Sequence, residues 1–361
     1  MGQSKPPRYT PAQLNLFVDA HERFVRGEPH GQRAVWRFVQ APHCDFSGRQ
    51  LCNADLTGAN LQAARLMLTN FDGACLHLAD LRDVTAQSAS FIRADLRGAS
   101  LKRADLRGAR FDEADLRQTA LSPVGADEEF RLLNRSAASG AQAEPDGFDV
   151  DFAQCSLKRA TLTNARLTRA NFAGALLKAA NLSGADLRGA CFTDAILTGA
   201  IIAQVRIDPQ AFAGCIIDPA PSALARAAEL ADRLAGSDRW IASDGAEGRS
   251  ADLDGEDLRP LSEQLTARRL TALSARQACA VGVSFAGAEL QGARFDGADL
   301  RDADFTGADL RGASFRGAKL RFAQFRNADL RPLPLAAGGA RAVDLAGADV
   351  SHDGLAHSRL S

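Results

Sequence analysis

The sequence predicts an all-β fold in which the chain winds into two four-sided tubes with short α-helical caps. Two observations support this prediction. A large apolar residue recurs at every fifth position through long stretches of the chain, and phenylalanine recurs at every twentieth position within them. The first period indicates a chain that turns once per five residues. The second indicates that four such turns complete one coil.

The five-residue period is clearest between Ala89 and Leu121. On an α-helix, five residues turn through about 500°, so successive large residues would form no stripe. On a single long strand, an odd period would place them on alternating faces. The chain therefore has to bend within each unit. The large apolar residues of this stretch are Phe91, Leu96, Leu101, Leu106, Phe111, Leu116 and Leu121.

Within each unit the side chains sort by position. The small residue two places before each large one, such as Ala94 before Leu96, points the same way as it would in a short extended segment. The acidic residue before the large one and the basic residue after it, here Asp95 and Arg97, then face outward. Glycine often follows two places after the large residue, as at Gly98, and suits a turn.

The phenylalanines indicate the length of one coil. A bulky ring at every fourth unit is expected if like residues stack between coils, which gives a four-sided tube with coils about 4.8 Å apart. Three series have this spacing: Phe71, Phe91 and Phe111; Phe152, Phe172, Phe192 and Phe212; and Phe285, Phe305 and Phe325.

The repeated unit resembles the pentapeptide-repeat family, whose motif is A(D/N)LXX. The units ADLRG at 94–98 and 104–108 match this motif in full. The resemblance implies that family's right-handed quadrilateral β-helix, a solenoid whose coils pack only on their neighbours. Members of the family are widespread in bacteria, so the resemblance also implies a bacterial protein.

Composition and charge exclude several classes of protein. The 361 residues carry a net charge of −1, which gives no support to a bulk electrostatic partner. No apolar run is long enough to span a membrane, and the N-terminus has no signal-peptide core. The seven cysteines include no C-x-x-C pair and are odd in number, which indicates a reducing compartment. We therefore expect a cytoplasmic location.

Residues 1–43 are expected to form an N-terminal helical cap. Residues 10–27 have helical periodicity, with Thr10 as the N-cap and Gly27 at the end. Such a helix would cover the open apolar end of a coil. We expect His21 to be a packed residue and not a ligand. The predicted apolar face of the helix consists of Leu14, Phe17, Val18, His21 and Val25.

The first tube is predicted at residues 44–217, interrupted by a loop at 122–147. The register of large apolar residues breaks across this polar segment and then resumes. Ala86 stands once in place of a large residue and marks a weak point in the first array. If the two arrays on either side of the loop are coaxial, they form one stack of coils.

Residues 218–252 leave the pattern, and we expect a helical linker that caps a second tube. The spacing from Trp240 to Gly248 echoes the spacing from Phe24 to Gly31 in the first cap. The predicted apolar face of this helix consists of Leu224, Ala227, Ala228, Ala231 and Leu234.

The second tube and a C-terminal tail are predicted at residues 253–361. A register slip is expected near Pro260. From Phe285 to Leu330, phenylalanine and leucine alternate strictly at the central positions. Two opposite walls should therefore carry phenylalanine and the other two leucine, and Leu345 continues the phase into one irregular coil.

The sequence contains no pattern that indicates catalysis. No arrangement of Ser, His and Asp suggests a triad, and no phosphate-binding glycine motif occurs. The Asp–Arg pattern recurs throughout the chain, whereas an active site would be singular. We expect no enzyme, and no catalytic, cofactor-binding or metal-binding residues. The expected structural core comprises Phe71, Phe91, Leu96, Leu101, Leu106, Phe111, Leu116, Phe172, Leu182, Leu187, Phe192, Phe295, Leu300, Phe305, Leu310 and Phe315.

Two functions remain. The first is a scaffold that binds unknown protein partners through its surface, without contacting nucleic acid or membrane directly. The second follows from the resemblance, because one branch of the family resembles DNA in shape and charge and binds or protects DNA gyrase. A homodimer through the C-terminal coil, where no capping helix is expected, is compatible with either function.

Charge balance argues against the DNA-like function. Such a protein needs an acidic face in place of phosphates. Residues 43–122 instead contain ten acidic and ten basic residues, residues 148–217 five and seven, and residues 283–332 seven and eight. The scaffold is therefore the expected function.

Overall fold

The computed structural model describes residues 9–117, 150–336, 338–350, 355 and 358–359. The loop expected at 122–147 lies outside the described residues. The chain divides into two compact units, residues 1–218 and 219–361. Each unit has its own hydrophobic core and is described by itself below.

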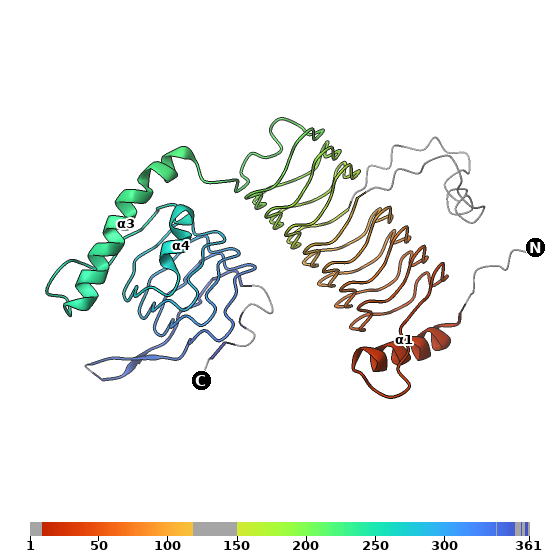
Figure 1. Cartoon of the computed structure of the whole chain (residues 1–361), viewed down its shortest axis with the longest axis horizontal. Helices are drawn as coiled ribbons and strands as arrows, with labels where there is room; N and C mark the ends of the chain where they lie inside the picture. Colours follow the sequence, from red (N-terminus) through yellow and green to blue (C-terminus); the bar gives the residue numbers. More distant parts are fainter. Residues whose placement is uncertain (1–8, 118–149, 337, 351–354, 356–357, 360–361) are drawn as a thin grey trace, which may run out of the picture. The chain divides into compact units, whose positions relative to one another are not determined.

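The first unit is a four-sided coil. Successive parallel bridge pairs occur five residues apart, at Asp55–Cys75, Asn60–Asp80, Arg65–Thr85 and Asn70–Ser90, and each joins residues twenty apart. In every pair, backbone groups bond between coils. For example, the amide of Cys75 donates to the carbonyl of Ala54 at 2.9 Å. The predicted coil of four units is thus confirmed, and its stacked turns can be followed from red to green in Figure 1.

The two arrays of the first unit form one continuous stack. Asp105 pairs with Asp151 and Asp115 pairs with Thr161, so these partners are 46 residues apart where a regular coil has 20. The chain therefore inserts 26 residues and then resumes on the same walls. Because 26 is not a multiple of five, the insertion also explains the break in the sequence register.

Phenylalanine rings form two stacks inside the first unit. Phe91 lies 5.1 Å from Phe71 and 4.8 Å from Phe111, with nearly parallel rings. Phe172 stacks in the same way on Phe152, at 5.2 Å. The two stacks lie on neighbouring walls, because Phe111 and Phe152 meet edge to face at 5.6 Å. The insertion thus moves the bulky column from one wall to the next.

The interior is filled by the central apolar residues and the small residues before them. All sixteen residues expected in the structural core are buried, with exposed fractions of 9% or less. Ala86 is also fully buried and stays in the bridge register. Burying one leucine or phenylalanine contributes about 1.5–3 kcal/mol, so the stack of coils provides the stability that a single coil lacks.

The corners of the coil require left-handed backbone geometry. Gly98 has φ of +68° at the position two residues after the central leucine, and Arg93 and Arg103 have φ of +57° at equivalent corners. Glycine adopts this geometry without steric cost, whereas other residues are strained there. Hydrogen bonds to the neighbouring coils hold the strained corners in place.

Helix α1 (Pro11–Val25) covers the first coil. Its N-terminus has a capping box, in which Thr10 and Gln13 exchange hydrogen bonds. Leu14, Val18 and His21 are buried as predicted. Phe17 and Val25 of the predicted apolar face are each 38% exposed, because only the part of α1 that overlies the coil is covered.

The coil of the first unit begins earlier than the expected boundary at residue 44. Val35 already pairs with Asp55, and Gln40 with Asn60. Ala34 and Val39 are buried at inward positions. The sequence pattern does not reveal this first coil, because Trp36 occupies the position of the usual leucine. In addition, Pro42 and His43 interrupt the pattern.

Helix α3 (Pro221–Ala242) packs against the second unit. Leu230, Leu234 and Ser237 are buried, whereas Leu224 of the predicted apolar face is 56% exposed. The prediction of Leu224 was wrong because the middle of α3 docks, not its first turn. The helix also continues through Trp240, beyond the end that was expected.

A glycine approaches the helix backbone in both caps. A side chain at Gly31 would lie 2.3 Å from the backbone nitrogen of Phe24, and one at Gly248 would lie 2.3 Å from the carbonyl oxygen of Gly236. Only glycine leaves room for this contact. The similar spacing in the two caps therefore has a common physical cause.

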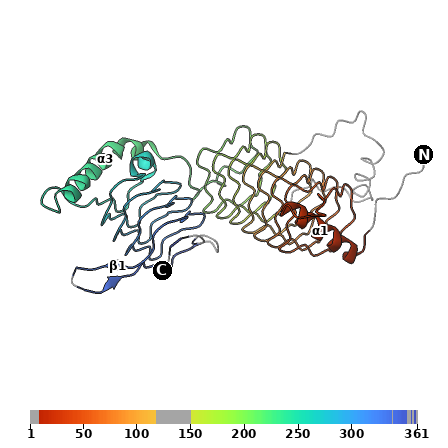
Figure 2. The ribbon, with the colours of Figure 1, turned by 60° about the horizontal axis from the view of Figure 1, so that its bottom comes forward.

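The second unit is a coil with two short insertions. Asp252 pairs with Ser274 across 22 residues, and helices η1 (Arg259–Leu261) and α4 (Ser262–Leu265) lie at this expected register slip. Ser314 pairs with Asp344 across 30 residues, and the additional ten include a hairpin of β1 (Leu333–Pro334) and β2 (Ala340–Arg341). Figure 2 shows this hairpin leaving the coil.

Two walls of the second unit carry phenylalanine. Phe285 and Phe305 stack at 5.1 Å on one wall, and Phe295 and Phe315 stack at 5.3 Å on another. The two stacks meet edge to face across the interior, with 5.5 Å between Phe285 and Phe295. The alternation predicted from the sequence is confirmed.

Candidate interaction surface

The outer walls are covered by ion pairs within and between coils. Arg97 contacts Asp95 in its own unit at 2.6 Å and Asp115 in the next coil at 3.8 Å. Arg117 contacts Asp115 at 2.6 Å. Two stacked carboxylates are thus neutralised by two guanidinium groups. Exposed pairs of this kind add little to stability, but the network fixes side-chain positions.

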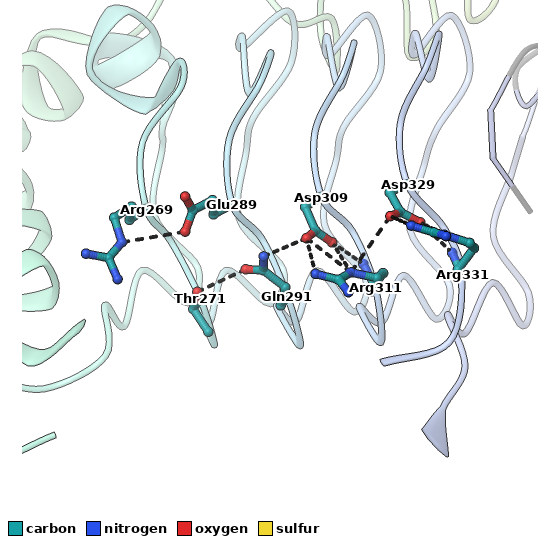
Figure 3. A network of polar contacts seen from close by, with 8 residues as sticks. All are labelled: Arg269, Thr271, Glu289, Gln291, Asp309, Arg311, Asp329 and Arg331. Atoms are coloured by element: carbon teal, nitrogen blue, oxygen red, sulfur yellow. Dashed lines mark hydrogen bonds and ion pairs between the residues drawn. The ribbon is translucent and has the colours of Figure 1, made fainter. Parts of the chain in front are cut away.

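One such network on the second unit is shown in Figure 3. Gln291 accepts a hydrogen bond from Thr271 at 3.0 Å and donates one to Asp309 at 2.7 Å. Arg311 then links Asp309, at 2.6 Å, to Asp329 of the next coil, at 3.8 Å. We call this wall the ladder face; it consists of Arg269, Thr271, Glu289, Gln291, Asp309, Arg311, Asp329 and Arg331.

The carboxylates of these networks are held as anions. Hydrogen bonds from Arg331 lower the pKa of Asp329 to about 2, and those from Arg107 lower the pKa of Asp105 to about 2. A general acid or base needs a pKa near the working pH. These aspartates are therefore poorly suited to proton transfer and well suited to fixing the positions of their arginines.

A second polar contact was missed by sequence reasoning. Ser274 donates a hydrogen bond to Asp254 of the preceding coil at 2.7 Å, and the amide of Arg276 donates to the same carboxylate at 2.8 Å. Ser90 and Asp72 repeat the contact in the first unit. The signal in the sequence is an aspartate directly after a central apolar residue, followed one coil later by a serine directly before one.

The β1–β2 hairpin rests on a corner of the second unit. A side chain at Gly312 would lie 2.8 Å from Cβ of Leu333, and one at Gly292 would lie 4.0 Å from its Cδ2. Leu333 therefore occupies space that glycine leaves free. Leu335, beyond β1, remains 47% exposed.

His21 fastens α1 to the coil. Its Nδ1 accepts a hydrogen bond from the amide of Ala34 at 3.0 Å, and its Nε2 lies 3.1 Å from the carbonyl of Cys52. The ring is therefore neutral, with its proton on Nε2. Burial lowers the pKa of His21 below its ordinary value. The expectation of a packed histidine is confirmed.

The remaining reactive side chains form no assembled site among the described residues. All seven cysteines are free thiols, and burial raises the pKa of Cys215 to about 11. Among the described residues, no three His, Cys, Asp or Glu side chains are grouped so that they could hold a metal ion. The helices in that part of the chain are all too short or too polar to cross a membrane. The sixteen core residues face inward, so none contributes to the outer surface.

Comparison with known proteins agrees with this geometry. A family model for pentapeptide repeats matches eight copies over more than half of the chain, at residues 44–83, 89–122, 148–184, 162–199, 270–307 and 293–331. The chain belongs to the pentapeptide-repeat family. Its four-sided coil is therefore the right-handed quadrilateral β-helix of that family, as predicted. No curated protein sequence matches the chain.

Solved structures of other pentapeptide-repeat proteins are similar to this chain. HetL, from the cyanobacterium Nostoc sp. strain PCC 7120, is 18% identical over 91% of this chain and 92% of its own, with a TM-score of 0.22. QnrB1, a plasmid-mediated fluoroquinolone resistance protein, is 16% identical over 80% and 91%, with a TM-score of 0.19. Structural similarities with such low sequence identities and TM-scores support no statement about function.

Proposed function

We propose that this pentapeptide-repeat protein is a non-enzymatic scaffold that binds other proteins. The observation that carries the proposal is the ladder face, where ion pairs and hydrogen bonds fix the side chains of successive coils in one plane. A surface fixed before binding loses little side-chain entropy on association. The interior is filled with apolar side chains, so recognition has to use the walls, the caps and the hairpin.

The hairpin is the part of the second unit best placed to select a partner. It departs from the repeat, and Leu335 beside it offers exposed apolar surface. A repeated wall offers the same groups at every coil and so discriminates poorly between partners. The hairpin is a single irregular feature beside a fixed wall, so it supplies the discrimination between partners that the wall lacks.

Site-specific photo-crosslinking in the native cell tests the scaffold. A photoreactive residue replaces Leu335, and a matched variant carries it at Leu68, which is 66% exposed on the first unit. We expect one or a few discrete protein adducts from position 335 and none from position 68. Equal, diffuse labelling at both positions would contradict the proposal.

The DNA-like alternative requires a continuous acidic face. The column of Asp95 and Asp115 shows why this function is less well supported, since Arg97 and Arg117 neutralise it. The discriminating measurement is DNA supercoiling by gyrase in the presence of the purified protein. Inhibition or protection at micromolar concentration would replace the scaffold proposal by the DNA-like one.

Two further parts of the proposal concern assembly and location. The described C-terminal coil has no capping helix, and Leu345 at its centre is half-buried, which supports a homodimer through this end. Sedimentation of the full chain tests the dimer.

The seven free thiols support a cytoplasmic location, because a reducing compartment keeps thiols unpaired.

A further inference from the structure

Arginine exceeds carboxylate on one face of the first unit. Bridge pairs join Arg166 to Asp186 and Asp186 to Arg206, so these three residues form one column across three successive coils. We call the surface around this column the arginine face. Its four arginines are all exposed; the face consists of Arg166, Arg169, Arg188 and Arg206, with Asp186 and Asp208.

Both carboxylates of the arginine face already have partners. Arg188 donates to Asp186 from Nε at 2.8 Å and from Nη2 at 2.6 Å. Asp208 accepts a hydrogen bond from the amide of Gly189 at 2.8 Å. Within the described part of the chain, no carboxylate lies at ion-pair distance from Arg166 or Arg206. Among the described residues, the face thus has four guanidinium groups and two carboxylates, an excess of positive charge.

The positions level with the column on the two neighbouring walls do not offset this charge. The outward positions level with the column are Thr161 and Asn181 on one neighbouring wall, and Asn171 and Cys191 on the other. None of these four side chains is a carboxylate, and Asp151 lies one coil before Asn171 on its wall. The arginine face thus differs from the ladder face, where carboxylates and guanidinium groups alternate.

We propose that the arginine face binds an acidic segment of a partner protein in an extended, polyproline-like conformation. The proposal rests on the scaffold function and names the chemistry of its partner. Arg166 and Arg206 are two coils apart, or about 10 Å. A polyproline helix presents the same side every three residues, about 9 Å along its axis. Acidic residues three apart therefore reach both arginines.

A protein segment fits this face better than a nucleic acid does. Duplex DNA carries one negative charge per about 1.7 Å and is bound through many phosphate contacts. Among the described residues, the arginine face offers two arginines with no carboxylate at ion-pair distance, and its neighbouring outward positions hold no aromatic side chain for stacking on bases. Guanidinium groups also bind carboxylates with two parallel hydrogen bonds.

Fluorescence anisotropy with the full chain tests the proposal. The probe is a labelled peptide of Glu-Pro-Pro repeats, which holds the polyproline conformation, and the control peptide has glutamine in place of glutamate. We expect binding of the first peptide only, weakening as salt is raised. The double variant R166Q/R206Q should bind it about tenfold more weakly.

The matched control is the double variant R311Q/R331Q, which removes two arginines that are already paired on the ladder face. It should change affinity less than about twofold. Equal weakening by both double variants, or no binding to the native chain, would overturn the proposal. Tighter binding of duplex DNA that is lost in R166Q/R206Q would assign the face to nucleic acid instead. Crosslinks at position 335 would leave the scaffold standing in either case.

Discussion

At the scale of single residues, His21 makes the first cap sensitive to protonation. Nδ1 accepts the Ala34 amide, so a proton added there would face another N–H group. The charged groups nearest the ring oppose one another: Arg33 lowers the pKa of His21 and Glu22 raises it, while burial remains the main cause of the lowered pKa. The folded site therefore favours the neutral ring.

The sign of the pH effect follows from this lowered pKa. Stability from neutral His21 is fully present above its unfolded pKa of 6.5 and is lost as pH falls through the folded value. Amides of residues 12–25 should therefore have lower protection factors at about pH 5 than at about pH 7.5, once the exchange rates are corrected for the intrinsic rate at each pH. Hydrogen exchange measured by mass spectrometry checks this.

The variant His21→Leu is the control for the pH effect. It should lower the free energy of unfolding at neutral pH by about 1–3 kcal/mol, because the Ala34 amide loses its partner. It should also remove the pH dependence of the α1 protection factors. The same dependence in the variant would show that another group titrates.

Glycine at one corner of the second unit makes room for the hairpin. The change Gly312→Ala places a methyl group against Leu333 in a backbone with φ of +68°. We expect faster proteolysis at residues 333–341 as well as the ordinary cost of left-handed alanine, about 1–2 kcal/mol.

The matched variant is Gly307→Ala, at a corner with φ of +67° and no atom within 4 Å of the added group. It should have the backbone cost alone and leave the hairpin protected. Equal proteolysis of the hairpin in both variants would mean that Leu333 does not depend on Gly312.

At the scale of the elements, each coil depends on its inward residues. Leu106 is fully buried between its neighbouring coils. Leu106→Asp would leave a charge without a partner in the core, so the first unit should unfold or lose several kcal/mol of stability. The outward variant Arg107→Gln should leave the melting temperature nearly unchanged. Thermal melts of the two variants compare them, and a native melt for Leu106→Asp would contradict the coil assignment.

The elements also show what sequence alone can predict. The five-residue period determines locally which positions face inward and which face outward. The coil, the phenylalanine walls and the mutual neutralisation of Asp and Arg could therefore all be predicted from the sequence. The docking segment of α3 cannot be predicted in this way, because helical periodicity does not reveal which part of a helix contacts the coil. Leu224 was assigned to the buried face for this reason. The column of the arginine face has the regular spacing of twenty residues, but which of its arginines lack a nearby carboxylate depends on side-chain positions that the spacing does not give.

At the scale of the whole molecule, the two units have separate cores. We expect residues 219–361 to fold alone, because α3 supplies Leu230 and Leu234 to the second core. Residues 253–361 lack this cover and should aggregate or melt at lower temperature. Circular dichroism of the two fragments tests this, and equal melting temperatures would show that α3 is dispensable.

The insertions have a consequence for how such a protein can change. The chain adds 26, two or ten residues and then returns to the same walls with its hydrogen bonds intact. The entropy cost of closing a loop grows only slowly with its length. The tube therefore tolerates variation in length at its corners while its walls stay constant, and a foreign recognition segment grafted between Pro334 and Ala340 would be presented without rebuilding the coil.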